Sequence, residues 1–267
     1  MKPAILITGA YGGMGKATAK ALRDEGFRVF ALDKTVGEEE ENIIPIEADI
    51  TDGESVKRAF DTVRSQTDEL FAIVHFAGVY MLDSLVEIDV GEFEKIFKIN
   101  LGGAYIVNKT FLSMLKSGSR ILITTSELAT LDPLPFTGIY AVTKSALDKY
   151  AYSLQMELQL MGIKVSVLRA GAVATNMLGV STAALDRFCE KTELYSCNAE
   201  RFKNIVESVE AKNVQPTAIA RKTIRILKKS SPRFAYSINR NPLLLFLNLL
   251  PKRFQLWVIK QVLKKKK

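Results

Sequence analysis

The sequence predicts an α/β protein with a doubly wound parallel sheet of about seven strands and helices on both faces. Short apolar segments alternate with segments of helical periodicity from the first residues onward. Strands that alternate with helices form βαβ units, whose right-handed crossovers give a parallel sheet covered on both sides. No internal repeat and no linker rich in Gly, Pro or Ser divides the chain. We therefore expect a single domain over residues 1–240.

Each expected strand is a short apolar run that ends near turn-forming residues. Helical periodicity fills the segments between these runs, up to about Gly26 and again over 55–63. A further helix is expected over 93–115, with an interruption near Gly102 and Gly103, and a long helix over 140–161. The strands are expected at 4–8, 28–32, 43–46, 71–74, 120–124, 163–168 and, as a possible seventh, 233–238.

The composition is typical of a folded protein in a reducing compartment. With 48% hydrophobic and 25% charged residues, a sizeable core is available. Cys189 and Cys197 have no nearby His, so no metal site is expected. The first strand is expected to begin at Ala4, so no signal peptide is expected, and no apolar run reaches the ~18 residues of a spanning helix. We expect a cytoplasmic protein.

The net charge of +8 arises entirely in the last fifth of the chain. Of the 37 Lys and Arg residues, 15 lie between Ala211 and Lys267, where there is no Asp or Glu. The residues before Ala211 carry 22 basic against 29 acidic side chains. Nucleic-acid binding is not expected, because no recognition motif accompanies the basic residues.

Residues 241–267 are expected to form a C-terminal extension that contains a basic amphipathic helix from Pro251 to Lys267. Such a helix suits peripheral contact with an anionic membrane. It also suits packing on the body of the protein or on a second subunit, and packing is the favoured interpretation. The apolar face of the helix is expected to contain Leu250, Phe254, Trp257, Val258 and Val262.

A glycine-rich turn joins the first expected strand to the first expected helix. It reads Thr8-Gly9-Ala10-Tyr11-Gly12-Gly13-Met14-Gly15. Glycines at such a turn let the backbone approach a pyrophosphate, which lies at the helix N-terminus. The strand before it and the helix after it predict dinucleotide binding and a Rossmann-type sheet.

An acidic residue at the end of the second strand indicates which dinucleotide is bound. Asp33 lies 18 residues after Gly15. A carboxylate there accepts hydrogen bonds from a ribose 2′-hydroxyl and repels a 2′-phosphate, so NAD is favoured over NADP. The adjacent Lys34 could soften this preference. Asp49, after the third strand, is placed to meet the adenine ring, to cap a helix, or both.

Tyr140 and Lys144 are four residues apart at the start of the long expected helix, so their side chains share one face. A nearby cation lowers the pKa of a phenol. The pair can therefore supply a phenolate near neutral pH. A Tyr and a Lys at this spacing also arise by chance, so the motifs around them carry the interpretation.

Together these motifs resemble those of the classical short-chain dehydrogenase/reductase family. The resemblance runs from Lys2 to about Met177 and more loosely to Ile238. It implies four catalytic residues: Asn100, Ser126, Tyr140 and Lys144. The cofactor-binding residues that it implies are Thr8, Gly9, Tyr11, Gly13, Met14, Gly15, Asp33, Asp49, Ile50, Ala77, Gly78, Asn100, Tyr140, Lys144, Gly171, Val173 and Thr175.

Three details depart from the family pattern. The family's Asn-Asn-Ala-Gly is His75-Phe76-Ala77-Gly78 here, and its Pro-Gly is Ala170-Gly171. His75 is expected to be a local hydrogen-bonding residue and not an acid or base. Ser126 lies 14 residues before Tyr140, one more than the commonest family spacing. Thr125 is therefore a rival for its role.

The resemblance also implies a mechanism. Tyr140 would exchange a proton with the substrate oxygen while a hydride moves between carbon and the nicotinamide. Lys144 and the positive nicotinamide would lower the pKa of Tyr140, and Lys144 would hold the ribose hydroxyls. Ser126 would donate to the substrate oxygen. Asn100 would hold a water that relays protons from Lys144.

The substrate is expected to bind among the loops after the fourth to sixth strands, including a substrate loop at about 175–215. These loops are mostly apolar, and residues 134–140 are similar to the hydroxysteroid and retinol dehydrogenase branch. An apolar secondary alcohol or ketone such as a hydroxysteroid is favoured. The substrate residues are expected to be Tyr80, Met81, Ser126, Leu128, Leu134, Phe136, Tyr140, Met177 and the stretch 178–210.

Several alternatives stay open. The substrate could instead be a small carbonyl metabolite. From a different class, the chain could be a cofactor-binding regulator without activity, although its intact Ser126, Tyr140 and Lys144 argue against this. Nucleotide-sugar epimerases share the Tyr-Lys pair but have a differently spaced glycine loop. Members of the resembled family commonly form homodimers or homotetramers.

Overall fold

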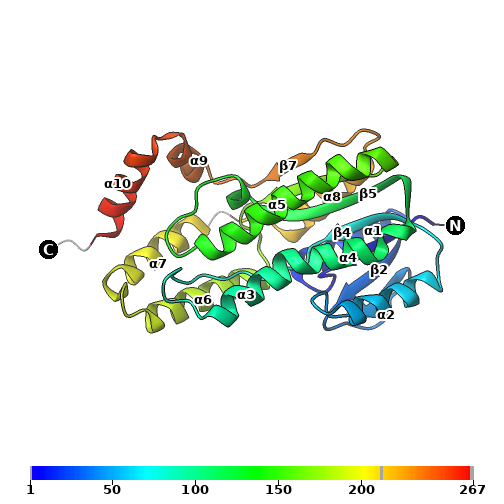
Figure 1. Cartoon of the computed structure of the whole chain (residues 1–267), viewed down its shortest axis with the longest axis horizontal. Coiled ribbons are helices and arrows are strands. Elements are labelled where there is room, and N and C mark those ends of the chain that lie inside the picture. The colour runs from blue at the N-terminus through cyan, green and yellow to red at the C-terminus, as the bar shows by residue number, and fades with distance from the viewer. Residues whose placement is uncertain (1, 211–212, 265–267) are drawn as a thin grey trace.

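The computed structural model contains one seven-stranded sheet in the order β3-β2-β1-β4-β5-β6-β7, in which every pair of neighbours is parallel (Figure 1). The structure describes residues 2–210 and 213–264, and the side chains of all of these except 176–182 and 207–210. The predicted doubly wound sheet is confirmed. Its strands are β1 (Ala4–Thr8), β2 (Arg28–Asp33), β3 (Ile43–Glu47), β4 (Leu70–His75), β5 (Leu115–Ser126), β6 (Lys164–Ala170) and β7 (Ala235–Ile238).

The strand order reverses at β1, which pairs with β2 on one side and β4 on the other. At the carboxyl end of β1, Thr8 lies opposite Leu32 of β2 and His75 of β4. The chains that leave β1 and β4 therefore diverge to opposite faces of the sheet. In an open α/β sheet this switch point is where a crevice for a ligand forms.

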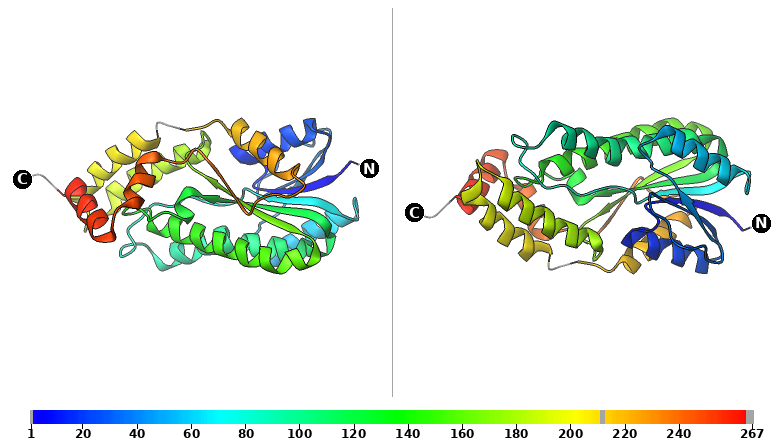
Figure 2. Two further views of the ribbon diagram at one scale, coloured as in Figure 1. Left: turned by 90° about the horizontal axis from the view of Figure 1, so that it is seen from above. Right: turned by 90° about the horizontal axis from the view of Figure 1, so that it is seen from below.

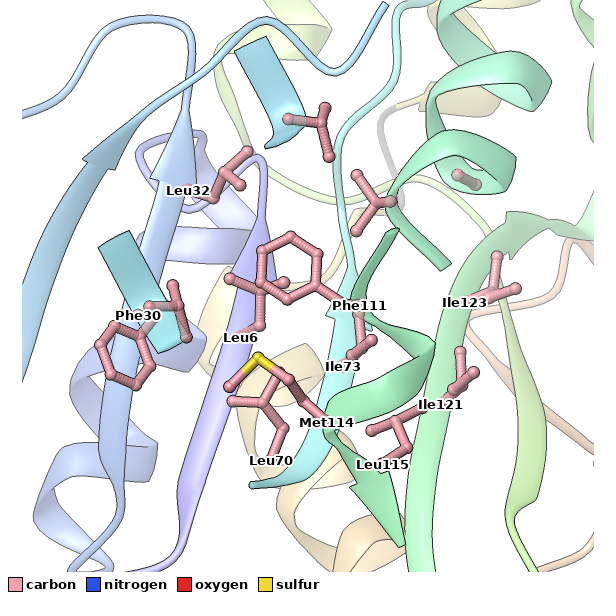
Figure 3. Packing of buried hydrophobic residues seen from close by; sticks show 14 of the residues in the cluster. Leu6, Phe30, Leu32, Leu70, Ile73, Phe111, Met114, Leu115, Ile121 and Ile123 are labelled. Carbon is pink, nitrogen blue, oxygen red and sulfur yellow. The ribbon is translucent and has the colours of Figure 1, made fainter. Parts of the chain in front are cut away.

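Helices cover both faces of the sheet, as Figure 2 shows. Alternate residues of β1 point to opposite faces. Leu6 joins a core cluster with α2, α4 and α5, whereas Ile5 and Ile7 join a second cluster with α1 and α8. Figure 3 shows part of the first cluster, where Phe30, Phe111 and Met114 are fully buried. The helices are α1 (Gly13–Asp24), α2 (Gly53–Arg64), α4 (Gly103–Phe111), α5 (Gly138–Leu158) and α8 (Pro216–Leu227).

The interruption expected near Gly102 and Gly103 is present, but it is a π-helical turn and not a break. Helix α3 (Val90–Phe97) runs into this turn (Lys98–Gly102), which continues into α4. Gly102 has helical backbone angles, φ −60° and ψ −43°. A Cβ on Gly103 would lie 2.4 Å from Cδ1 of Ile50. Glycine is required there by close packing of α4 on the loop after β3.

Residues 175–215 were expected to form a loop, and the structure shows two helices, α6 (Asn176–Lys191) and α7 (Ser196–Glu210). With α9 (Pro242–Leu249) and α10 (Lys252–Leu263) they form a helical lobe beyond the carboxyl ends of the strands (Figure 1). A separate apolar cluster that includes Leu185, Phe188 and Phe202 holds α6 against α7.

The described residues contain no helix that is both long enough and apolar enough to cross a membrane.

Candidate active site

A cleft of about 1070 Å³ opens at the switch point between β1 and β4. The glycine loop forms one wall, and residues 76–80 after β4 form another. Such a volume is typical of cofactor and ligand sites. Of the residues expected to bind a cofactor, those that line this cleft are Gly9, Tyr11, Gly13, Met14, Gly15, Asp33, Asp49, Ile50, Ala77, Gly78 and Thr175.

The glycine loop is folded so tightly that side chains do not fit. Gly9 has a positive φ of +67°, and a Cβ on it would lie 2.5 Å from the Ala77 nitrogen. A Cβ on Gly15 would lie 2.0 Å from the Gly9 carbonyl oxygen, and one on Gly13 would lie 2.7 Å from Cγ2 of Thr175. The loop thus brings bare backbone to the cleft, as close approach to a pyrophosphate requires.

Helix α1 begins at this loop, and among the described residues no side chain accepts a hydrogen bond from the N–H groups of its first turn. Its N-cap, Gly12, has no side chain to accept a hydrogen bond, and its first turn contains no acidic residue. The backbone N–H groups and the helix dipole there favour an anion. The start of α1 therefore fits the pyrophosphate of a dinucleotide.

The Asp33 carboxylate is held at the rim of the cleft by two backbone donors. Its Oδ2 accepts from the Tyr11 N–H at 2.8 Å, and its Oδ1 accepts from the Lys34 N–H at 2.8 Å. A carboxylate has about four acceptor positions, so it can still accept from ribose hydroxyls.

Asp49 is held in a local turn. The Lys34 ammonium donates to its Oδ2 at 2.9 Å, and both the N–H and the hydroxyl of Thr51 donate to its Oδ1, at 2.9 and 2.7 Å. The Lys34 and Thr51 hydrogen bonds lower the pKa of Asp49 to about 2. The side chain that caps α2 is Asp52, which accepts from the Glu54 N–H at 3.0 Å. Asp49 is therefore not the cap of this helix, and its adenine contact stays a prediction.

Tyr140, Lys144 and Ser126 meet where the end of β5 faces the first turns of α5. All three side chains are buried. The Ser126 hydroxyl is close enough to that of Tyr140 to favour its ionised form, and Ser126 Oγ accepts from the Leu128 N–H at 3.2 Å. The Lys144 ammonium lies 5.7 Å from the centre of the Tyr140 ring. The structure thus brings together the three residues that the sequence placed in one site.

The protein groups by themselves do not make Tyr140 acidic, contrary to the expectation for its pair with Lys144. Burial raises the pKa of Tyr140 to about 12, and the Ser126 hydrogen bond only partly opposes this. Burial also lowers the pKa of Lys144 to about 8. The sequence indicated the neighbouring cation but not the depth of burial, which has the larger effect here.

Thr125, the rival of Ser126, is engaged about two turns further along α5 than Tyr140. Its hydroxyl donates to the Asp148 carboxylate at 3.2 Å. Asp148 also pairs with the Arg169 guanidinium at 2.7 Å. The Thr125 hydroxyl is therefore held in a contact away from that of Tyr140. The longer spacing between Ser126 and Tyr140 does not displace Ser126 from the site.

Asn100 fixes the chain after β4 to the π-helical turn. Its Oδ1 accepts from the Val79 N–H at 2.8 Å, and its Nδ2 donates to the Val79 carbonyl at 3.0 Å and to the Thr143 hydroxyl at 3.1 Å. A Cβ on Gly78 would lie 3.1 Å from Asn100 Oδ1 and 3.3 Å from the Lys144 ammonium. Asn100 thus has a clear structural role, and its part in a proton relay stays a prediction.

His75 lies inside the protein, where it forms hydrogen bonds and carries no charge. Its Nδ1 is 3.3 Å from the Thr8 hydroxyl, and its Nε2 is 2.9 Å from Oδ1 of Asn108. Asn108 in turn donates to the Tyr150 hydroxyl at 3.2 Å. Burial lowers the pKa of His75 to about 4. The expectation of a local hydrogen-bonding residue is confirmed.

The expected substrate residues divide into two groups. The first packs around Tyr140: the rings of Tyr80 and Tyr140 have centres 4.9 Å apart, and Met81 and Leu128 belong to the same apolar cluster.

The second group contains Leu134 and Phe136, which pack into the helical lobe. The Phe136 ring lies 4.5 Å from that of Phe188 and 5.1 Å from that of Phe202, between ring centres. These two residues therefore position α6 and α7, and direct substrate contact stays a prediction for them. Met177 lies in α6, and its side chain, with those of 178–182, is outside the described residues.

Two glutamates that the sequence analysis missed tie the lobe to the site. Glu87 accepts at Oε1 from the N–H groups of Glu193 and Leu194, at 2.9 and 3.1 Å. Glu127, directly after Ser126, accepts at Oε2 from the Asn241 N–H at 2.7 Å, and burial raises its pKa. Each contact joins residues more than 100 positions apart. No local spacing could have indicated them.

Gly171, Val173 and Thr175 follow β6 and lead into α6. A Cβ on Gly171 would lie 1.9 Å from the Asn239 carbonyl oxygen, so the departure from Pro-Gly at Ala170 leaves the essential glycine in place. Val173 forms an isolated parallel bridge with Val214. Thr175 lines the cleft, whereas Val173 and Thr8 are buried beside it.

The family model for short chain dehydrogenase matches residues 3–186. The chain belongs to this family. Mouse estradiol 17-beta-dehydrogenase 2 is 35% identical over 188 residues, which cover 66% of this chain but only 49% of the mouse protein. The uncharacterized oxidoreductase YbbO of Escherichia coli K12 is 34% identical over 181 residues, 66% of this chain and 67% of that protein. This short-chain dehydrogenase thus spans about half the length of the mouse relative.

Solved structures agree on the fold. A short-chain dehydrogenase from Streptomyces avermitilis superimposes with a TM-score of 0.78, covering 98% of this chain and 94% of that one, at 19% identity. Short-chain dehydrogenases are a family of oxidoreductases that bind a nicotinamide cofactor. The residues fit such a group, because the cleft combines bare glycine backbone, the uncapped start of α1 and the fixed Asp33 carboxylate.

Proposed function

We propose that this short-chain dehydrogenase uses NAD(H) to interconvert a secondary alcohol and a ketone on an apolar molecule, such as a hydroxysteroid. The observation that carries the proposal is the buried pair of Tyr140 and Ser126 side chains, covered by the apolar side chains of Tyr80, Met81 and Leu128. Because the Tyr140 and Ser126 hydroxyls lie side by side, both can reach a single substrate oxygen. An apolar cover suits the body of a sterol better than that of a sugar.

Tyr140 is the acid–base group of this proposal. In oxidation its phenolate accepts the hydroxyl proton of the substrate, and in reduction its phenol donates the proton back. Ser126 donates a hydrogen bond to the same substrate oxygen, where negative charge develops. When bound, the nicotinamide supplies the hydride transfer.

Lys144 provides a positive charge near Tyr140 and a group through which protons can be exchanged. Its pKa of about 8 keeps it largely protonated at neutral pH while allowing it to exchange a proton there. A pKa of about 12 for Tyr140 is too high for a general base near neutral pH. We therefore expect Tyr140 to become a phenolate only when a positive charge in the cleft adds to that of Lys144.

Asp33 supports the choice of NAD over NADP. Its carboxylate lies at the end of β2 and is fixed by the Tyr11 and Lys34 N–H groups. A 2′-phosphate beside it would meet a negative charge with no freedom to turn away. The Lys34 ammonium, which could attract such a phosphate, is paired with Asp49.

The relatives support the substrate class. The mouse relative is named for its action on estradiol, and its match covers 66% of this chain. The apolar residues around Tyr140 agree with a substrate of that kind.

Absorbance of the reduced nicotinamide tests the proposal. NAD and NADP are each offered with hydroxysteroids, retinoids and short alcohols, and we expect turnover of NAD with a hydroxysteroid or similar lipid-like alcohol. Turnover of short alcohols alone would instead favour a reductase of small carbonyl metabolites. Tyr140→Phe should lower kcat by about 10²- to 10⁴-fold.

Tyr150→Phe is the matched control, since it removes a half-buried phenol hydroxyl of the same helix, which accepts from Asn108. It should retain activity. Full activity of Tyr140→Phe would contradict the mechanism.

A further inference from the structure

Helix α9 presents an apolar face to solvent. Leu243, Phe246 and Leu249 are 64%, 62% and 81% exposed, and they lie three residues apart on one side of the helix. Only Leu244 is buried. The helix contains no charged residue. A helix that is apolar all round is normally enclosed on every side, so this face calls for a partner.

Helix α10 packs on α7 by a side other than its predicted apolar face. Gln255 is its buried residue, and Leu263 packs against the apolar cluster of α6 and α7. The Leu263 carbonyl accepts from Asn198 Nδ2 at 2.6 Å. Trp257 is 54% exposed and stacks on Phe254, with ring centres 5.4 Å apart. The helix therefore packs on the protein as favoured, but not through the apolar face that the sequence predicted.

Cations surround this exposed apolar surface. Arg253, Lys260 and Lys264 stand at i−4, i+3 and i+7 from Trp257 and so share its side of α10. Arg240 precedes α9 and is exposed. The segment after residue 210 has no acidic residue of its own. Two acids face it from the loop after β5: Asp132, which is paired with Lys252, and Glu127, which accepts from the Asn241 N–H and lies near Arg240.

We infer that α9 and α10 dock this protein on an anionic lipid bilayer. Leu243, Phe246, Leu249 and Trp257 enter the interface, while Arg253, Lys260 and Lys264 bind headgroup phosphates. An apolar helix face with Trp and flanking lysines is the chemistry of interfacial helices. A second copy of the chain is a poorer occupant, because pairing the same surfaces would bring like charges together.

The docking surface is tied to the loop that follows the catalytic strand. Glu127 accepts from the Asn241 N–H at 2.7 Å, and the Asp132 N–H donates to Asn248 Oδ1 at 2.6 Å. In Figures 1 and 2, α9 and α10 lie at the end of the molecule opposite the N-terminus. Docking there leaves α1 and α8 facing solvent and places the substrate side of the site toward the bilayer. This orientation has functional meaning only with the apolar substrate proposed above, whereas docking itself does not depend on it.

Vesicle co-sedimentation of the full chain tests the inference. Vesicles of phosphatidylcholine with phosphatidylglycerol are compared with phosphatidylcholine alone, at low salt and at 0.5 M salt. We expect binding to the anionic vesicles at low salt and its loss at high salt. Arg253→Gln/Lys260→Gln/Lys264→Gln should weaken binding by about 100-fold, since each cation near the surface contributes roughly fivefold. Phe246→Glu/Trp257→Glu should abolish it.

Leu160→Glu is the matched control, because Leu160 is 86% exposed on the 3₁₀ turn after α5 and outside the proposed surface. It should bind as the unchanged protein does. Unchanged melting temperatures would show that the variants are folded. Absence of binding to anionic vesicles, or equal binding by all variants, would overturn the inference. So would a dimer in sedimentation velocity without vesicles that Phe246→Glu/Trp257→Glu dissociates.

Discussion

The glycine loop and the helical lobe face each other across the site and are held by different kinds of contact. In the loop, backbone atoms meet backbone atoms so closely that a Cβ on Gly15 would lie 2.0 Å from the Gly9 oxygen. In the lobe, rings such as Phe136 and Phe188 pack 4.5 Å apart, and single carboxylates such as Glu87 supply the ties. The close backbone packing of the glycine loop permits few substitutions, whereas the side-chain packing of the lobe permits many. The cofactor loop could therefore be predicted from the sequence, whereas the substrate could not.

The largest expected effect on cofactor binding is that of Gly15→Ala in the loop. The added Cβ would overlap the Gly9 carbonyl, and overpacking of this kind costs roughly 1–3 kcal/mol or more. We expect NADH affinity to fall by about 100-fold, measured by calorimetry. Gly53→Ala is the control, since a Cβ there meets nothing within 4 Å. Unchanged affinity in Gly15→Ala would show that the loop is adaptable after all.

Phe136→Ala should affect the lobe and spare the loop. Removal of a ring that contacts Phe188, Tyr195 and Phe202 should lower the free energy of unfolding by about 3 kcal/mol. Urea denaturation measures this loss. The substrate KM should rise, while the dissociation constant of NADH should stay within twofold. An equal weakening of NADH binding would mean that the two regions are coupled.

Most of the strands and the meeting of Ser126, Tyr140 and Lys144 in one site could be predicted from the sequence because local patterns encode them. The strands are apolar runs, and Tyr140 and Lys144 are a spacing on one helix. The two helices of 176–210 were missed, although Leu185, Phe188, Ala199 and Phe202 are apolar at helical spacing. The attachment of the lobe could not be predicted, because it depends on contacts between residues far apart in the sequence, such as Glu127 with Asn241. Burial, which raises the pKa of Tyr140, has no local signature either.

Lys144→Met should separate the effect of Lys144 on stability from its effect on turnover. Burial lowers the Lys144 pKa from 10.5 to about 8, so between these values the unfolded chain binds more protons than the folded one. The free energy of unfolding of the unchanged protein should therefore rise with pH in this window, relative to the variant. Between pH 8 and 9.5 we expect a gain of about 2 kcal/mol, measured by urea denaturation.

The same Lys144→Met variant should be more stable than the unchanged protein at pH 7 and should lose turnover. Equal pH dependence of the two proteins would mean that Lys144 keeps an ordinary pKa in the folded state.

The smallest expected effect concerns cofactor choice. Asp33→Ser removes the negative charge at the end of β2 and should shift the ratio of NADP to NAD use by about tenfold toward NADP. Steady-state kinetics with both cofactors measures the ratio. Asp52→Ser is the control, because serine preserves the cap of α2 away from the ribose position. A ratio that did not move in Asp33→Ser would assign the choice to another residue.

The π-helical turn at Lys98–Gly102 makes the length of this helix as important as its composition. A π-helical turn amounts to one residue inserted into an α-helix. Removing one residue would close this turn to ordinary α-helix and leave the helix after it in place. The Asn100 amide, which the wider turn directs to the Val79 N–H, would then lose its position. A deletion here should therefore keep the fold of the helix while it detaches the chain after β4.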